Sequence, residues 1–173
     1  LATFTALLSI AEAESGANRK ALEPVRLADV VRLAADLYEP VAEEKGLILV
    51  TDIRAEPTVR GNEQLLAQAV SNLLDNAIKY TPEGGRITLL LEGTAPGQSA
   101  RITVADNGPG IPADMREKVL ERFVRLDTAR ASPGNGLGLS LVEAVARLHD
   151  ASLRLEDNEP GLRVGIVFPP DAG

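Results

Sequence analysis

Two asparagines stand four residues apart in the stretch NLLDNAIKYTP, at positions 72 and 76, and Lys79 and Tyr80 follow them. On a helix with about 3.6 residues per turn, Asn72, Asn76 and Lys79 form one polar column. The apolar residues of the same segment lie beside this column: Leu66, Ala69, Val70, Leu73 and Ala77. Half-buried amides need partners, so the column predicts either hydrogen bonds to neighbouring backbone or a bound ion or ligand.

A carboxylate ends the predicted strand in ARITVADNGPGIP, residues 100–112. Asp106 stands at the strand end, where it can accept a hydrogen bond. Gly108 and Gly110 follow it and allow the backbone to approach a flat ligand closely. Taken alone, this segment also fits an ordinary turn.

A glycine-rich segment, SPGNGLGLSLV, precedes the last predicted helix and holds Gly134, Gly136 and Gly138. Exposed N–H groups at such a helix start suit a phosphate. A dinucleotide-binding motif would need G-x-G-x-x-G directly after a strand. Here G-x-G-x-G follows a long loop, so the context excludes that motif.

In this order and spacing, the three segments resemble the ATP-binding catalytic domain of sensor histidine kinases, a branch of the Bergerat-fold ATPases. The likeness covers residues 22–170. The asparagine box is NLLDNAIKY, the first glycine box DNGPGIP, the phenylalanine box ERFVR and the last glycine box GNGLGL. The resemblance implies ATP and Mg²⁺ as cofactors.

The resemblance also implies roles for single residues of the asparagine box and of the strand end. Asn76 would coordinate Mg²⁺, Asn72 would belong to the same polar wall, and Lys79 would lie near the phosphates. Tyr80 would pack on the nucleotide, and Asp106 would accept the adenine amino group. Asn72 and Lys79 are therefore candidate catalytic residues.

The other boxes complete the implied site. Arg122 and Arg125 would meet phosphate charge, with Arg125 a third catalytic candidate, and Phe123 would anchor a lid that closes over ATP. The remaining residues would shape the adenine pocket or wrap the phosphates: Gly108, Gly110, Ile111, Gly134, Gly136, Leu137 and Gly138. Phosphoryl transfer needs mainly positioning and charge neutralisation, which such groups can supply.

One departure bears on the reaction. In hydrolytic relatives the position of Asn72 is typically a glutamate that activates water, and an amide cannot take up that proton. This favours a kinase over an efficient ATPase. Alternatives are a degenerate nucleotide-binding scaffold without kinase activity, an anti-sigma-type serine kinase on the same fold, and a hydrolytic ATPase.

The accepting histidine of such kinases lies on a dimeric helical hairpin, whereas the sole histidine here, His149, ends the last predicted helix. We expect His149 to be structural. The opening residues carry a helical apolar stripe and resemble the end of the hairpin's second helix, although a helix packed on its own domain also fits. We expect residues 1–21 to be that end plus a linker and 22–173 the catalytic domain, unable to autophosphorylate alone. Implied partners are a response-regulator receiver domain and, in the full-length protein, a second copy through the hairpin.

The order of helical and strand segments along the chain predicts an α+β two-layer sandwich, with about three helices on one face of a mixed sheet. A helix should begin at Asp29 as N-cap, and a short helix should span 115–123. The predicted buried face of the first helix consists of Val30, Leu33, Ala34, Leu37 and Val41. Strands are expected in LILVTDI, RITLLLE, ARITVAD, SLRLED and RVGIVF.

Composition narrows the function classes. A net charge of −7 and an aromatic content of 3% disfavour nucleic-acid binding. Cysteine is absent, which removes thiolate metal sites and disulfides. No apolar run of about 18 residues occurs, so we expect no membrane contact by this segment and a cytoplasmic location, with any anchor of the full-length protein elsewhere.

Overall fold

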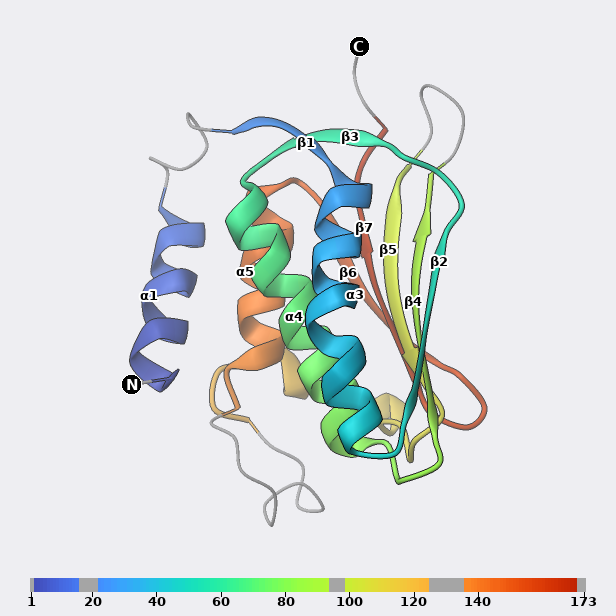
Figure 1. Cartoon of the computed structure of the whole chain (residues 1–173). Helices are drawn as coiled ribbons and strands as arrows, with labels where there is room; N and C mark the ends of the chain where they lie inside the picture. The colour runs from blue at the N-terminus through green and yellow to red at the C-terminus, as the bar shows by residue number, and fades with distance from the viewer. Residues whose placement is uncertain (1, 16–21, 94–98, 125–135, 171–173) are drawn as a thin grey trace.

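The computed structural model describes residues 2–15, 22–93, 99–124 and 136–170. Within these ranges, one mixed sheet is covered by helices on one face (Figure 1). In spatial order its strands are β2 (Ile48–Ile53), β4 (Arg86–Glu92), β5 (Arg101–Asp106), β7 (Leu162–Val167) and β6 (Ser152–Asp157). β2 runs parallel to β4, and the other neighbours pair antiparallel. The predicted two-layer fold is confirmed.

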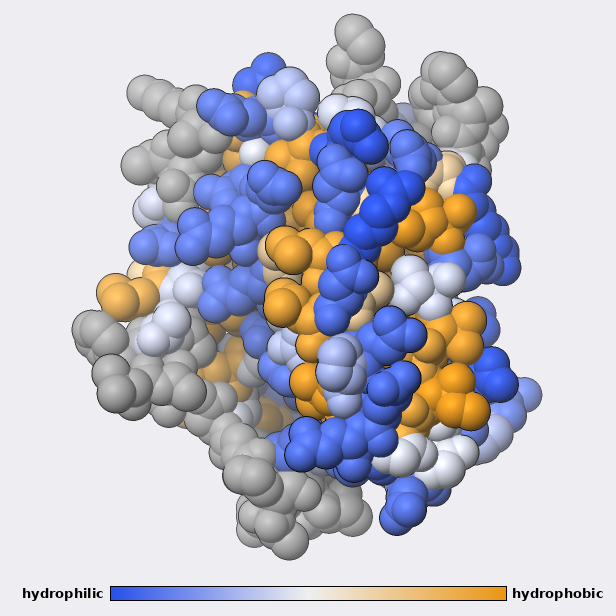
Figure 2. All heavy atoms as spheres, in the orientation of Figure 1, coloured by the Kyte–Doolittle hydropathy of each residue, from blue (hydrophilic) through white to orange (hydrophobic). Residues whose placement is uncertain are grey.

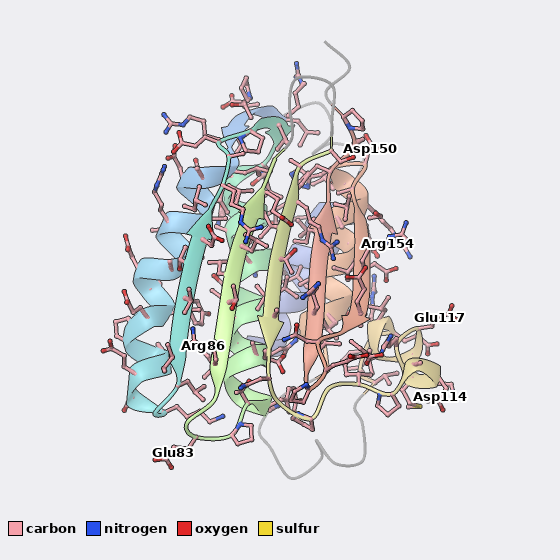
Figure 3. All side chains as sticks on the ribbon, turned by 90° about the vertical axis from the view of Figure 1, so that its right-hand side faces the viewer. Glu83, Arg86, Asp114, Glu117, Asp150 and Arg154 are labelled. Carbon is pink, nitrogen blue, oxygen red and sulfur yellow. The ribbon has the colours of Figure 1, made fainter. Side chains whose placement is uncertain are left out.

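Helices α3 (Leu27–Glu44), α4 (Glu63–Tyr80) and α5 (Gly138–Leu148) form the second layer. Successive strand residues point to opposite faces, so alternate residues of the central strands face the helices. Five of them are at most 2% exposed: Ile87, Leu89, Leu91, Ile102 and Val104. Figure 3 views the sheet from its other face, which none of these helices covers.

Helix α1 (Ala2–Glu14) lies along α5 (Figure 1). Its residues Ile10 and Ala13 are buried. In the described part of the chain, the opening helix therefore packs against α5.

Helix α3 differs from the prediction at its start and on its buried face. It begins at Leu27, and Asp29 lies in its first turn, where it accepts hydrogen bonds from Arg26 and Arg32. Of the five predicted core residues, Val30 and Ala34 are buried. The other three, Leu33, Leu37 and Val41, are 51%, 58% and 43% exposed, and Figure 2 shows hydrophobic surface along α3. The residues that are buried are mostly smaller: Leu27, Ala28, Val30, Val31, Ala34 and Ala42.

The misjudged face of α3 has a simple geometric cause. Two apolar stripes overlap on this helix, and they differ by about 100° around its axis, which is one residue. The prediction gave weight to the large leucines. The structure instead turns the stripe of smaller residues inward, where it meets α4 and β2.

Four further elements differ from the predicted pattern. Strand β1 (Glu23–Arg26) pairs antiparallel with β3 (Thr58–Gly61), and neither was predicted. The predicted helix over 115–123 is instead two 3₁₀ turns, η1 (Ala113–Met115) and η2 (Lys118–Leu120). Their bonds span three residues, as from the Leu120 N–H to the Glu117 carbonyl, so no regular α-helix forms.

Helix α4 has clear start and stop signals. The Asn62 side chain accepts a hydrogen bond from the Leu65 N–H at 3.0 Å and caps the first turn. At the other end, Thr81 has extended backbone, with φ −83° and ψ 126°, because Pro82 disfavours a helical residue before it. Between these signals, the apolar face of α4 packs on α3, α5 and β5.

His149 connects the end of α5 to the start of α4. It is 6% exposed, and its Nε2 accepts a hydrogen bond from the Asn62 N–H at 2.9 Å. Its Nδ1 lies 2.7 Å from the Val145 carbonyl oxygen, so the neutral ring donates there. Burial lowers the pKa of His149 below its ordinary 6.5. The ring is structural, as expected.

We predict that His149 makes the fold less stable as the pH falls below about 6.5. The folded-state pKa is lowered, so the unfolded chain binds the extra proton first, and stability is lost toward the folded-state pKa. Urea unfolding of the wild type and of His149→Gln at pH 7.5 and 5.5 measures this. The chain has a single histidine, so the variant should lose this part of the pH dependence. Equal pH dependence in both proteins would contradict the prediction.

Candidate functional site

The last two turns of α4 carry the polar column that the sequence singled out. Asn72 and Asn76 are both half-buried, at the margin of the helix's apolar face. Lys79 Nζ lies 5.0 Å from the centroid of the Tyr80 ring, a cation–π distance, and Tyr80 is 37% exposed. The end of α4 thus presents two amides, a cation and an aromatic ring.

The start of α5 meets this column at Asn76. A Cβ atom on Gly138 would lie 3.5 Å from Nδ2 of Asn76 and 3.6 Å from its Oδ1. The N-terminus of a helix carries partial positive charge. Leu137, which precedes α5, is fully buried and fixes this end of the helix in the core. The asparagine box and the last glycine box therefore come together, although they are more than 60 residues apart in sequence.

Asp106 lies at the end of β5 and is 8% exposed. Its Oδ1 accepts hydrogen bonds from the Gly108 N–H at 2.9 Å and the Leu162 N–H at 3.4 Å. Burial raises the pKa of the Asp106 carboxyl, and the two N–H donors partly offset that rise. Among the described residues no hydrogen bond engages its Oδ2, so this oxygen can accept one from a ligand.

Gly108 joins Asp106 to the end of α4. A Cβ atom at this position would lie 2.9 Å from the Tyr80 carbonyl oxygen and 3.1 Å from Asp106 Oδ1. Any side chain would push these groups apart, so glycine is required here. Gly110 and Ile111 continue the same loop: Gly110 lies against the Gly161 carbonyl, and Ile111 is half-buried. Asp106, Gly108 and Tyr80 are therefore close neighbours.

These groups share one end of the sheet. Glu83 and Arg86 mark the turn from α4 into β4 in Figure 3, and Asp114 and Glu117 mark the 3₁₀ turns at the same end.

The phenylalanine box contacts the last glycine box through backbone. Phe123 has a φ of 65° and donates its N–H to the Gly136 carbonyl at 3.0 Å. Its ring is 58% exposed. The structure thus holds the two sides of the segment 125–135 together. Arg125 and Gly134 lie outside the described residues.

Arg122 is engaged away from the polar column. Its Nη2 lies 2.5 Å from Oε1 of Glu14 in α1, and both side chains are about half exposed. Exposed ion pairs of this kind contribute little to stability, so the pair is readily exchanged for another partner.

One residue of this region escaped the sequence analysis. Lys45 follows α3, and its Nζ donates to the carbonyl oxygens of Lys79 at 3.0 Å and Thr81 at 3.1 Å. It also contacts the Ile78 carbonyl oxygen. A lysine before Gly46 signals only the end of its own helix, so no pattern could assign it to the end of α4.

A magnesium ion at this site would need oxygen ligands from these residues. No cluster of three acidic or histidine side chains that could hold a metal occurs among the described residues. Mg²⁺ often takes only one or two protein oxygens and completes its shell with phosphates and water. The amide oxygen of Asn76 fits that requirement. In the described part of the chain, no helix combines the length and apolar character needed to span a bilayer.

Residues 61–172 match the family described as "Histidine kinase-, DNA gyrase B-, and HSP90-like ATPase". The signal transduction histidine-protein kinase/phosphatase MprB of Mycolicibacterium smegmatis is 41% identical over 160 residues, which cover 87% of this chain and 32% of that protein. The chain therefore spans about a third of the length of this relative.

Two solved structures are also similar. The mycobacterial sensor histidine kinase MprB superimposes with a TM-score of 0.75 at 33% identity, over 86% of this chain and 97% of that one. Full-length ShkA in complex with AMPPNP gives a TM-score of 0.80 at 30% identity, over 95% and 34% of the two chains. The predicted family is confirmed. The chain belongs to the histidine kinase-, DNA gyrase B- and HSP90-like ATPases and is an ATP-binding catalytic domain of the sensor histidine kinase type.

Proposed function

We propose that this domain binds Mg-ATP and transfers the γ-phosphate to a histidine on a dimerisation hairpin of the full-length protein. The phosphate then passes to an aspartate of a response-regulator receiver domain. In this proposal, residues 1–21 are the end of the hairpin and its linker, and the domain works in the cytoplasm, where ATP is available. The observation that carries the proposal is that α4 has Asn76 against Gly138 on one turn and Tyr80 against Gly108 and Asp106 on the next.

The adenine end of the site would be formed by Asp106 and Tyr80. The free Oδ2 of Asp106 would accept the adenine amino group, while Oδ1 stays bonded to backbone N–H groups. The Tyr80 ring would lie on the flat base, and Gly108, Gly110 and Ile111 would form the floor. A buried, oriented acceptor gives selectivity because a ligand without a matching donor would leave it unpaired.

The phosphate end would be formed by Asn76, Asn72, Lys79 and the start of α5. Asn76 would offer its amide oxygen to Mg²⁺, which neutralises phosphate charge when bound. Lys79 and the N–H groups after Leu137 and Gly138 would contact phosphate oxygens. The lid side of the site would be completed by residues of the phenylalanine box and the last glycine box: Arg122, Phe123, Arg125, Gly134 and Gly136.

Transfer is favoured over hydrolysis because of Asn72. This side chain stands one turn before Asn76 on α4 and has no group that can accept a proton from water. The scaffold alternative is tested by supplying the dimerisation hairpin with radiolabelled Mg-ATP. An acid-labile, base-stable label on its histidine supports a kinase, and an unlabelled hairpin with bound ATP would support a scaffold.

We predict that Asn76→Ala weakens the binding of Mg-ATP by about tenfold or more, which is about 1.4 kcal/mol. The loss should largely disappear in EDTA, because the amide oxygen acts through the metal. Isothermal titration with and without Mg²⁺ measures both values. Gln64→Ala removes an exposed amide from the first turn of the same helix and should bind as the wild type does. An equal loss with and without Mg²⁺ would sink the metal role of Asn76.

We predict that Asp106→Asn loses ATP affinity while keeping or gaining stability at pH 7. The folded-state pKa of Asp106 is raised, so its charge opposes folding at neutral pH, and wild-type stability rises as the pH falls through that pKa. The stability advantage of the variant should therefore be larger at pH 7 than at pH 5. Thermal unfolding at both pH values and titration with Mg-ATP test this. Unchanged ATP affinity would remove Asp106 from the adenine site.

A further inference from the structure

Lys45 follows α3, whereas the proposed contacts to the nucleotide lie on other elements. Its ammonium group nevertheless donates hydrogen bonds to the backbone at the end of α4, which carries some of those contacts. The carbonyl oxygens of Lys79 and Thr81 accept from Nζ at 3.0 and 3.1 Å, and Ile78 supplies a third carbonyl. The Ile78 and Lys79 carbonyls belong to the last turn of α4, and Thr81 is the residue that follows the helix. They have no partner further along the helix because the helix ends there.

The charge of Lys45 is directed at this helix end. None of the ion pairs among the described residues involves Lys45, although Glu43 and Glu44 are near in sequence. The C-terminus of a helix carries partial negative charge, which a cation offsets. An ammonium with three donors can satisfy three carbonyls at once.

The same backbone turn is fixed from two further sides. The Gly84 N–H donates to the Gly46 carbonyl at 2.8 Å, so the turns after α3 and α4 are joined. The Thr81 side chain is 1% exposed, and the Tyr80 carbonyl lies where Gly108 makes its close approach. A shift of the Tyr80–Thr81 backbone would therefore move the loop that holds the Asp106 carboxylate.

We propose that Lys45 is a positioning residue for the adenine end of the nucleotide site. It holds the last turn of α4 in the position that sets Tyr80 against Gly108 and Asp106. The inference rests on the proposed function, because it assigns Lys45 to the end of the site that would bind adenine and not to the end that would bind the phosphates.

A helix cap that served stability alone would behave differently. Its loss would lower the folded fraction, and binding would fall only in proportion. A positioning residue changes the affinity of the fully folded protein, and the change is the same for every ligand that shares the adenine contacts.

The test compares Lys45→Met, Lys45→Arg and the wild type by titration with ADP in EDTA and with Mg-ATP, at a temperature where all are fully folded. Lys45→Met should weaken both ligands by the same factor, about five- to tenfold, because the site is no longer preorganised. Lys45→Arg, which keeps donors and charge, should recover part of the loss. Amide NMR signals of Gly108 and Leu162 should shift in the ligand-free Met variant.

Arg54→Met is the matched control. It removes the same charge from a residue that pairs with Asp52 and Glu92 beyond the opposite end of β2, and it should bind both ligands normally. Wild-type affinity in folded Lys45→Met, or a loss confined to Mg-ATP, would overturn the proposal. If wild type itself bound neither ligand, the proposed function would fail with it.

If the Lys45→Met variant does not fold, a measurement on the wild-type protein tests the proposal instead. Saturation with ADP should shift the Cε signal of Lys45 in the wild type, because Lys45 contacts the end of α4 and the bound adenine would contact Tyr80 at the same end. An unmoved Lys45 signal, with shifts at Gly108, would overturn the proposal.

Discussion

The close approach between the end of β5 and the end of α4 is the contact on which this site depends. It is possible because Gly108 has no side chain and lies between the Tyr80 carbonyl and the Asp106 carboxylate. Sheet register sets one side of the contact, since Asp106 stands opposite Ile87 in the β4–β5 pair. The Asn107 side chain adds a hydrogen bond from the Arg86 N–H at 2.8 Å. The helix layer and the sheet layer thus meet at one defined point.

Keeping a carboxylate at this point costs stability. Asp106 is buried and its pKa is raised, and among the described residues its carboxylate is compensated by two backbone N–H groups. The neighbouring Thr81 hydroxyl is buried without a hydrogen-bond partner in the described structure. Unsatisfied polar groups of this kind concentrate where a fold serves binding as well as stability. Burial of the apolar faces of α4 and α5 supplies stabilising free energy that offsets the cost of these polar groups.

Local patterns predicted much of this arrangement. The period of α4, its Asn62 cap and the Pro82 stop are visible in sequence, and they place Asn72 and Asn76 at the margin of the buried face. The face of α3 was misjudged because two overlapping stripes carry equal periodicity, and only packing decides between them. Lys45 and the β1–β3 pair could not be found, because each depends on partners more than 30 residues away that no local pattern specifies. The Arg122 pair with Glu14 is likewise a tertiary contact between chain segments 108 residues apart.

The bond between His149 and Asn62 has a mechanical consequence. Helices α4 and α5 run antiparallel, so His149 ties the end of α5 to the cap of α4, while Gly138 and Asn76 face each other at the opposite end. The two helices are therefore held to each other at both ends, by the histidine at one end and by buried Leu137 beside Gly138 at the other.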